Sequence, residues 1–179
     1  RMTDACIVFL RRNGFHVESK DVENSRLKAF RRSIHFPGLL HGLGLSGHRD
    51  ERFLLKIDCQ DQHYSYTPAT AFIKGCGYAF PFPVPPDPIL CAMKLSALLS
   101  RGKGRDFYDA MFLLQQTAPD YGFLADKRGL HNLAELKAAA ASLLERTDLA
   151  VKQRDFEHLL FSSENSRRIL HFAAFMQSL

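Results

Sequence analysis

Residues 87–109 hold the densest group of side chains that could do chemistry. The four basic and two acidic residues concerned are Lys94, Arg101, Lys103, Arg105, Asp106 and Asp109. Transfer of phosphoryl or nucleotidyl groups needs positive charge around a polyphosphate, and it usually needs carboxylates that hold divalent metal. The segment therefore predicts a site for a polyphosphate.

Helical signals position these charges. Asp87 can cap the free N–H groups at a helix start, and Pro88 suits the first helical position. Apolar residues then recur at helical spacing. Lys94 and Arg101 are seven residues apart, so two turns of helix place both cations on nearly one face. The turn 102–104, Gly-Lys-Gly, ends this helix, and a second helix begins near Arg105. The charges are thus expected around one helix–turn–helix corner.

The same charges also have a purely structural interpretation. Arg105 and Asp109 are four residues apart, so they could form a surface helix pair worth only ~0.3–0.5 kcal/mol. Asp106, near the start of its helix, would interact favourably with the helix dipole. A structural domain in which these charges form an ion-pair lattice is therefore one alternative.

The order of these residues resembles the "K…R.K.RDxxD" signature of the AbiEii/AbiGii toxin-like nucleotidyltransferases. The matching residues are Lys94 and, after six intervening residues, Arg101, Lys103, Arg105, Asp106 and Asp109. The segments FPGLLHGLGLS (36–46) and RFLLKIDCQ (52–60) also resemble segments that precede the signature in that family. The resemblance covers roughly residues 27–115. The family's Gly-Ser followed by a paired Asp-x-Asp does not occur in this sequence.

The resemblance implies roles for individual residues. It implies catalytic roles for Asp58, Lys94 and Asp106, with Asp58 also binding Mg²⁺. The nucleotide-binding residues that it implies are Lys94, Arg101, Lys103 and Arg105. Asp58 matches the acid of the family's "KIE/KID" strand. Because a carboxylate is costly to bury unpaired, Asp58 should lie at an exposed strand end or beside a cation or metal. A plain solvent-facing residue is the alternative.

The amino-acid composition limits the size of the core and the partners that can be expected. With 179 residues, 46% of them hydrophobic, the chain can bury one sizeable core. The net charge of +5 suggests an anionic partner, although many proteins carry such a charge without a specific reason. The four cysteines are widely spaced, which favours reduced thiols and a cytoplasmic location over a zinc site or a disulfide framework. No apolar run approaches the ~20 residues that cross a bilayer, so no membrane partner is expected.

The expected fold class is α+β, with a mixed, mostly antiparallel, nucleotidyltransferase-like palm sheet flanked by helices and a C-terminal helical bundle. Residues 1–117 would form the α+β domain and 118–179 the helical region. Besides the corner, helices are expected at 3–13, 133–146, 148–161 and 163–176, and strands at 15–19, 26–36, 53–59, 69–73 and 78–84. Segments 39–47 and 118–129 are expected to be irregular.

The resemblance implies transfer of a nucleotide from an NTP to an RNA or protein acceptor, with transfer RNA as one possible RNA. It also implies a cognate antitoxin as partner. Because the paired carboxylates are missing, the chain is expected to be an incomplete enzyme or a degenerate, noncatalytic module that binds a nucleotide or a partner. Little or no transfer is expected from these 179 residues alone.

Overall fold

The computed structural model describes residues 2–21 and 30–179. Contacts divide the chain into two compact units, Arg1–Tyr64 and Ser65–Leu179. The division into residues 1–117 and 118–179 stays a prediction.

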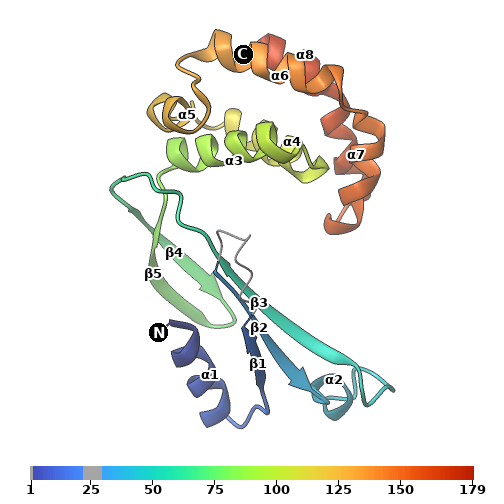
Figure 1. Ribbon diagram of the computed structural model, residues 1–179. Coiled ribbons are helices and arrows are strands. Elements are labelled where there is room, and N and C mark those ends of the chain that lie inside the picture. Colours follow the sequence, from blue (N-terminus) through green and yellow to red (C-terminus); the bar gives the residue numbers. More distant parts are fainter. Residues whose placement is uncertain (1, 22–29) are drawn as a thin grey trace. The chain divides into compact units, whose positions relative to one another are not determined.

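The first unit is a small antiparallel sheet with one helix packed on it. Its elements are α1 (Met2–Arg12), β1 (Glu18–Asp21), β2 (Phe30–Pro37), α2 (Leu39–Gly42) and β3 (Arg52–Cys59). The strands follow the order β1-β2-β3 (Figure 1). Four buried residues form the core between helix and sheet: Ile7, Val17, Ile34 and Phe36.

Most of the predicted elements of this unit are confirmed. The helix at 3–13 and the strand at 53–59 form close to the expected bounds. The strand expected at 15–19 begins later, at Glu18, and part of the strand expected at 26–36 lies outside the described residues. The prediction of an irregular segment at 39–47 is wrong for α2, which begins after Gly38. Gly38 has a φ of 65°, and glycine adopts this left-handed conformation without strain.

The second unit begins with a two-stranded hairpin of β4 (Ala69–Gly75) and β5 (Tyr78–Val84). Its turn places Cys76 and Gly77 at positive φ, 50° and 82°, which suits the tight turn of a hairpin. All pairs between the described strands are antiparallel. The chain mixes helices and strands, 52% and 20% of its residues, in small sheets. The expectation of one palm-like sheet is wrong for the described strands, which form a three-stranded sheet and a separate two-stranded one. The nucleotidyltransferase-like character of the fold stays a prediction.

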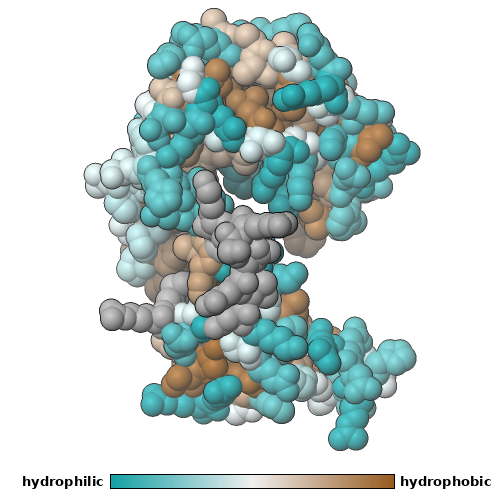
Figure 2. Space-filling model, viewed as in Figure 1, coloured by the Kyte–Doolittle hydropathy of each residue, from teal (hydrophilic) through white to brown (hydrophobic). Residues whose placement is uncertain are grey.

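Helices make up the rest of the second unit. They are α3 (Asp87–Arg101), α4 (Gly104–Leu114), α5 (Tyr121–Arg128), α6 (Leu133–Glu145), α7 (Leu149–Phe156), η1 (Glu157–Leu159), η2 (Ser163–His171) and α8 (Phe172–Ser178). They share a core in which the rings of Phe107 and Phe172 meet edge to face, with centroids 5.0 Å apart. On the face shown in Figure 2, hydrophilic side chains cover most of this helical part, and apolar side chains show between them in smaller patches.

The helix boundaries follow local caps. Asn132 accepts a hydrogen bond from Glu135 N–H and Asp148 accepts one from Ala150 N–H, as expected for the N-caps of α6 and α7. The prediction of an irregular segment at 118–129 is wrong. It contains α5, because Asp120 accepts from Phe123 N–H at 2.6 Å and caps the helix. The helix expected at 148–161 ends at Phe156, where η1 follows it.

Candidate functional site

The predicted corner between α3 and α4 is present, and its turn is short. Gly102 ends α3 in the left-handed region, with a φ of 54°, and its N–H donates to Leu98 O at 2.9 Å. Lys103 is extended, and α4 begins at Gly104. One detail of the prediction is wrong: Asp87 is the first residue of α3, and Pro86 occupies the N-cap position without a side-chain cap.

Asp106 fixes the geometry of this corner. Its side chain is fully buried, and it accepts hydrogen bonds from Arg101 Nε at 2.8 Å and Arg101 Nη2 at 2.6 Å. It also accepts from the backbone N–H of Lys103 at 3.1 Å. The hydrogen bond to Asp106 raises the pKa of Arg101 above its ordinary value. Arg101 and Asp106 therefore form a pair that holds the turn, and the catalytic role of Asp106 stays a prediction.

Lys94 forms the second pair between the two helices. Its Nζ lies 2.7 Å from Asp109 Oδ2, and the two side chains are 38% and 34% exposed. Lys94 and Arg101 thus both reach carboxylates of α4, which confirms that their seven-residue spacing places them on one face. Asp109 pairs with Lys94, and among the residues that the structure describes Arg105 forms no ion pair with Asp109.

A pocket of about 540 Å³ opens beside the corner. The residues that line it come from the corner, α7 and η1: Arg101, Lys103, Gly104, Arg105, Lys152, Asp155, Phe156, His158 and Leu159. Three predicted nucleotide-binding residues, Arg101, Lys103 and Arg105, therefore gather at one pocket. Lys94 is not part of its lining.

The contribution of α7 was not predicted from the sequence. Lys152 follows Asp148, the N-cap of α7, by one turn of helix, but Arg154 has the same charge and belongs to the same helix. Only the packing of α7 against α4 decides which of the two cations lines the pocket, and it is Lys152.

Asp58 lies in the first unit, on β3. It stands opposite Arg31 in the antiparallel register with β2, and Arg31 Nε donates to Asp58 Oδ1 at 2.8 Å. The Asp58 side chain is 50% exposed. This arrangement agrees with the prediction of a carboxylate beside a cation at an exposed position.

The donor set around Asp58 does not fit Mg²⁺. The ion takes several oxygen ligands, and the described part of the chain contains no group of three or more His, Cys, Asp or Glu side chains that could hold a metal. The role of Asp58 as a metal ligand stays a prediction that the described residues do not support.

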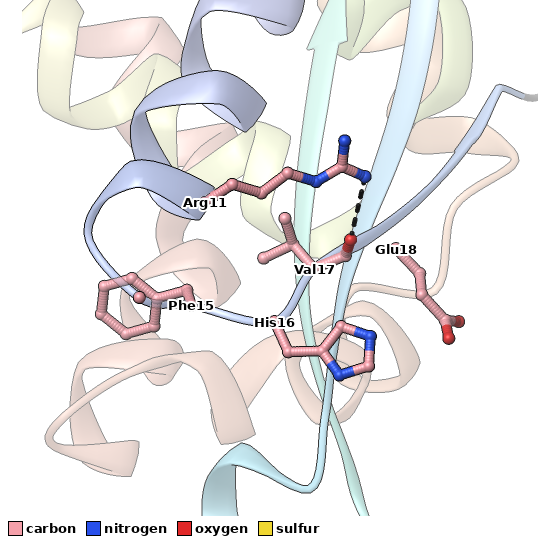
Figure 3. Close-up of a pocket in the computed structure, with 6 residues that line it drawn as sticks. Arg11, Phe15, His16, Val17 and Glu18 are labelled. Atoms are coloured by element: carbon pink, nitrogen blue, oxygen red, sulfur yellow. Dashed lines mark hydrogen bonds between the residues drawn. The ribbon is translucent and has the colours of Figure 1, made fainter.

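A second pocket, of about 570 Å³, lies where α1 leads into β1. Figure 3 shows Arg11 reaching over to the carbonyl of Val17, with Phe15 and Glu18 on opposite sides. Arg11 Nη2 donates to Val17 O at 3.2 Å. This bond ties the end of α1 to the start of the sheet, so Arg11 has a structural role in the first unit.

Comparison with known proteins gives one clear finding. The family model described as "Nucleotidyl transferase AbiEii toxin, Type IV TA system" matches residues 4–178, nearly the whole chain. A search of curated proteins and a search of solved structures give no significant match. None of the described helices has the length and apolar character that crossing a membrane requires. The paired charges of the α3–α4 corner agree with the signature from which the same family was predicted. The chain therefore belongs to the AbiEii nucleotidyl transferase toxin family.

Proposed function

We propose that this chain acts as a nucleotidyltransferase-like toxin that transfers a nucleotide from an NTP to an RNA or protein acceptor. Transfer RNA is one candidate acceptor, and a cognate antitoxin is the expected protein partner. The observation that supports this proposal most is the match of the family across residues 4–178. The cations of the α3–α4 corner supply the charge that a triphosphate needs.

In this proposal Lys94 contacts the triphosphate directly. Its ammonium group has three N–H donors, and Asp109 accepts from one of them, so two donors remain for phosphate oxygens. Arg101 keeps three of its five donors, because Asp106 accepts from Nε and Nη2. The carboxylates of α4 thus orient both cations without using all their donors. Lys103 and Arg105 would add further phosphate contacts.

Nucleotidyltransferases generally use a divalent metal that neutralises the triphosphate. The described residues around Asp58 do not supply such a site, since Arg31 already donates to its carboxylate. The chemistry that we assign to these residues is therefore limited to binding and orienting the nucleotide.

The second candidate function is a noncatalytic module that binds a nucleotide or a partner protein. One observation favours it: the sequence contains neither the Gly-Ser nor the Asp-x-Asp expected of an active family member. Metal-dependent transfer of labelled nucleotide from NTPs to total RNA distinguishes the two candidates. Incorporation of label by the purified chain would support the enzyme, and nucleotide binding without incorporation would support the module.

The nucleotide site itself is tested with Lys94→Ala. A hydrogen bond to a charged group is worth about 1.5–3 kcal/mol, so we expect calorimetric titration to show NTP affinity roughly ten- to a hundredfold weaker. A matched control is Lys127→Ala, which removes an α5 lysine that also pairs with a carboxylate, Asp126, at 2.7 Å. Equal NTP affinity in the wild type and Lys94→Ala would contradict the proposed site.

A further inference from the structure

The pocket between the α3–α4 corner and α7 is positively charged. It is lined by four cationic side chains, Arg101, Lys103, Arg105 and Lys152, and by one carboxylate, Asp155. We propose that this pocket binds a phosphate group, with Lys152 of α7 as a ligand besides the corner residues. The inference rests on the proposed function, because Lys103 and Arg105 belong to both.

The charge balance of the pocket favours an anionic ligand. Arg101 is neutralised by the buried Asp106, at 2.6 Å. Within the described residues, Lys103, Arg105 and Lys152 form no ion pair. Three cations without a paired carboxylate thus face one pocket that contains a single acidic side chain. Their mutual repulsion favours an anion, and phosphate offers several acceptor oxygens at once.

Close packing of α7 against α4 brings Lys152 to the corner. A Cβ atom added to Gly104 would lie 2.0 Å from Lys152 O and 2.7 Å from Phe156 Cδ1. The backbones of α4 and α7 therefore meet at this glycine, at the first residue of α4. Phe156 is buried, and its ring lies 5.8 Å from that of Tyr108 of α4. These contacts fix the position of α7, so the helix that carries Lys152 is in place beside the corner before a ligand binds.

The size and lining of the pocket suit a small organic molecule that carries phosphate. The pocket volume of about 540 Å³ lies within the ~300–1,000 Å³ common for small-molecule sites. Phe156 and Leu159 add apolar surface beside the cations. A phosphate joined to a larger organic group fits this combination, and such a group belongs both to a nucleotide and to a nucleic-acid backbone.

The experiment compares Lys152→Ala with Arg154→Ala in the 179-residue chain. Both changes remove one positive charge from α7, but Arg154 is exposed and does not line the pocket. Binding of inorganic tripolyphosphate, of an NTP and of a short single-stranded RNA is measured by titration. Circular dichroism of each variant checks that the helices are retained.

We expect Lys152→Ala to weaken binding of at least one probe about tenfold or more, and Arg154→Ala to weaken it less than about threefold. An effect on tripolyphosphate and NTP would identify the nucleotide as the source of the phosphate. An effect on RNA alone would identify the nucleic-acid backbone. Equal effects of the two substitutions would indicate general electrostatic attraction and overturn the proposal, as would unchanged binding of every probe by Lys152→Ala.

Failure of this inference can be told from failure of the proposed function. If Lys94→Ala weakens NTP binding while Lys152→Ala binds every probe as the wild type does, the nucleotide site stands and the α7 pocket does not. If Lys152→Ala weakens tripolyphosphate or RNA binding while Lys94→Ala binds NTP as the wild type does, the pocket stands. The proposed triphosphate contact of Lys94 is then wrong.

Discussion

The contact between α4 and α7 depends on Gly104, and its replacement by alanine tests how the helical unit is built. Gly104 does not have a positive φ, so its own backbone conformation allows a side chain. The neighbouring helix does not allow one. The added Cβ would lie 2.0 Å from Lys152 O and 2.9 Å from Lys152 C, both of which are backbone atoms that cannot rotate away.

The magnitude follows from these distances. An ordinary contact begins near 3.4 Å, so α7 would have to withdraw by about 1.4 Å from the 2.0 Å position. Overpacking of this kind typically costs about 1–3 kcal/mol, and withdrawal of α7 would also loosen the packing around the buried Phe156. The preference for alanine over glycine, up to about 1 kcal/mol, applies to helix interiors, and Gly104 is the first residue of α4, so it offsets little of the cost. We expect a net destabilisation of roughly 1–3 kcal/mol.

The assay is urea denaturation followed by circular dichroism, with thermal melting beside it. For a chain of this length, 1 kcal/mol corresponds to about 2–4 °C, so Tm should fall by roughly 2–12 °C. The control is Gly42→Ala at the end of α2, where a Cβ would meet nothing within 4 Å. It should change the free energy of unfolding by less than about 0.5 kcal/mol or raise it slightly. A Gly104→Ala variant as stable as the wild type would refute the close approach of α4 and α7.

Two further predictions concern the buried groups of the helical unit. Arg101→Ala leaves the fully buried Asp106 without its two side-chain N–H donors. We therefore expect the free energy of unfolding to fall by about 1.5–3 kcal/mol. A loss no larger than that of Arg154→Ala would contradict the structural role of the Arg101–Asp106 pair. Burial raises the pKa of the Cys91 thiol from 9.0 to about 11. The contribution of the buried neutral thiol to stability is therefore complete below pH 9.0 and is lost as the pH rises towards 11. In native protein, thiol labelling at pH 8 should modify the exposed Cys59 and Cys76 and reach Cys91 only after unfolding, and rapid labelling of Cys91 would disprove its burial.

Local signals in the sequence predict much of this protein. The cap residues Asn132 and Asp148 mark the starts of α6 and α7, because a cap bonds to backbone only two or three residues away. The seven-residue spacing of Lys94 and Arg101 is also a local signal, because two turns of one helix place both side chains on nearly the same face. Asp120 is the exception: its cap is equally local, but the neighbouring proline and glycine are also typical of a loop, so α5 was missed.

Contacts between distant residues were decided by tertiary structure alone. Asp109 could pair with Arg105 on its own helix or with Lys94, fifteen residues earlier, and the packing of α3 against α4 selects Lys94. Asp58 meets Arg31 because antiparallel register places them opposite each other. Because Gly104 has no side chain, the backbone of α7 can approach α4 closely, and this packing places Lys152, and not Arg154, at the pocket. Periodicity along the chain specifies which face of an element a residue occupies, whereas the neighbour of that face depends on how whole elements pack.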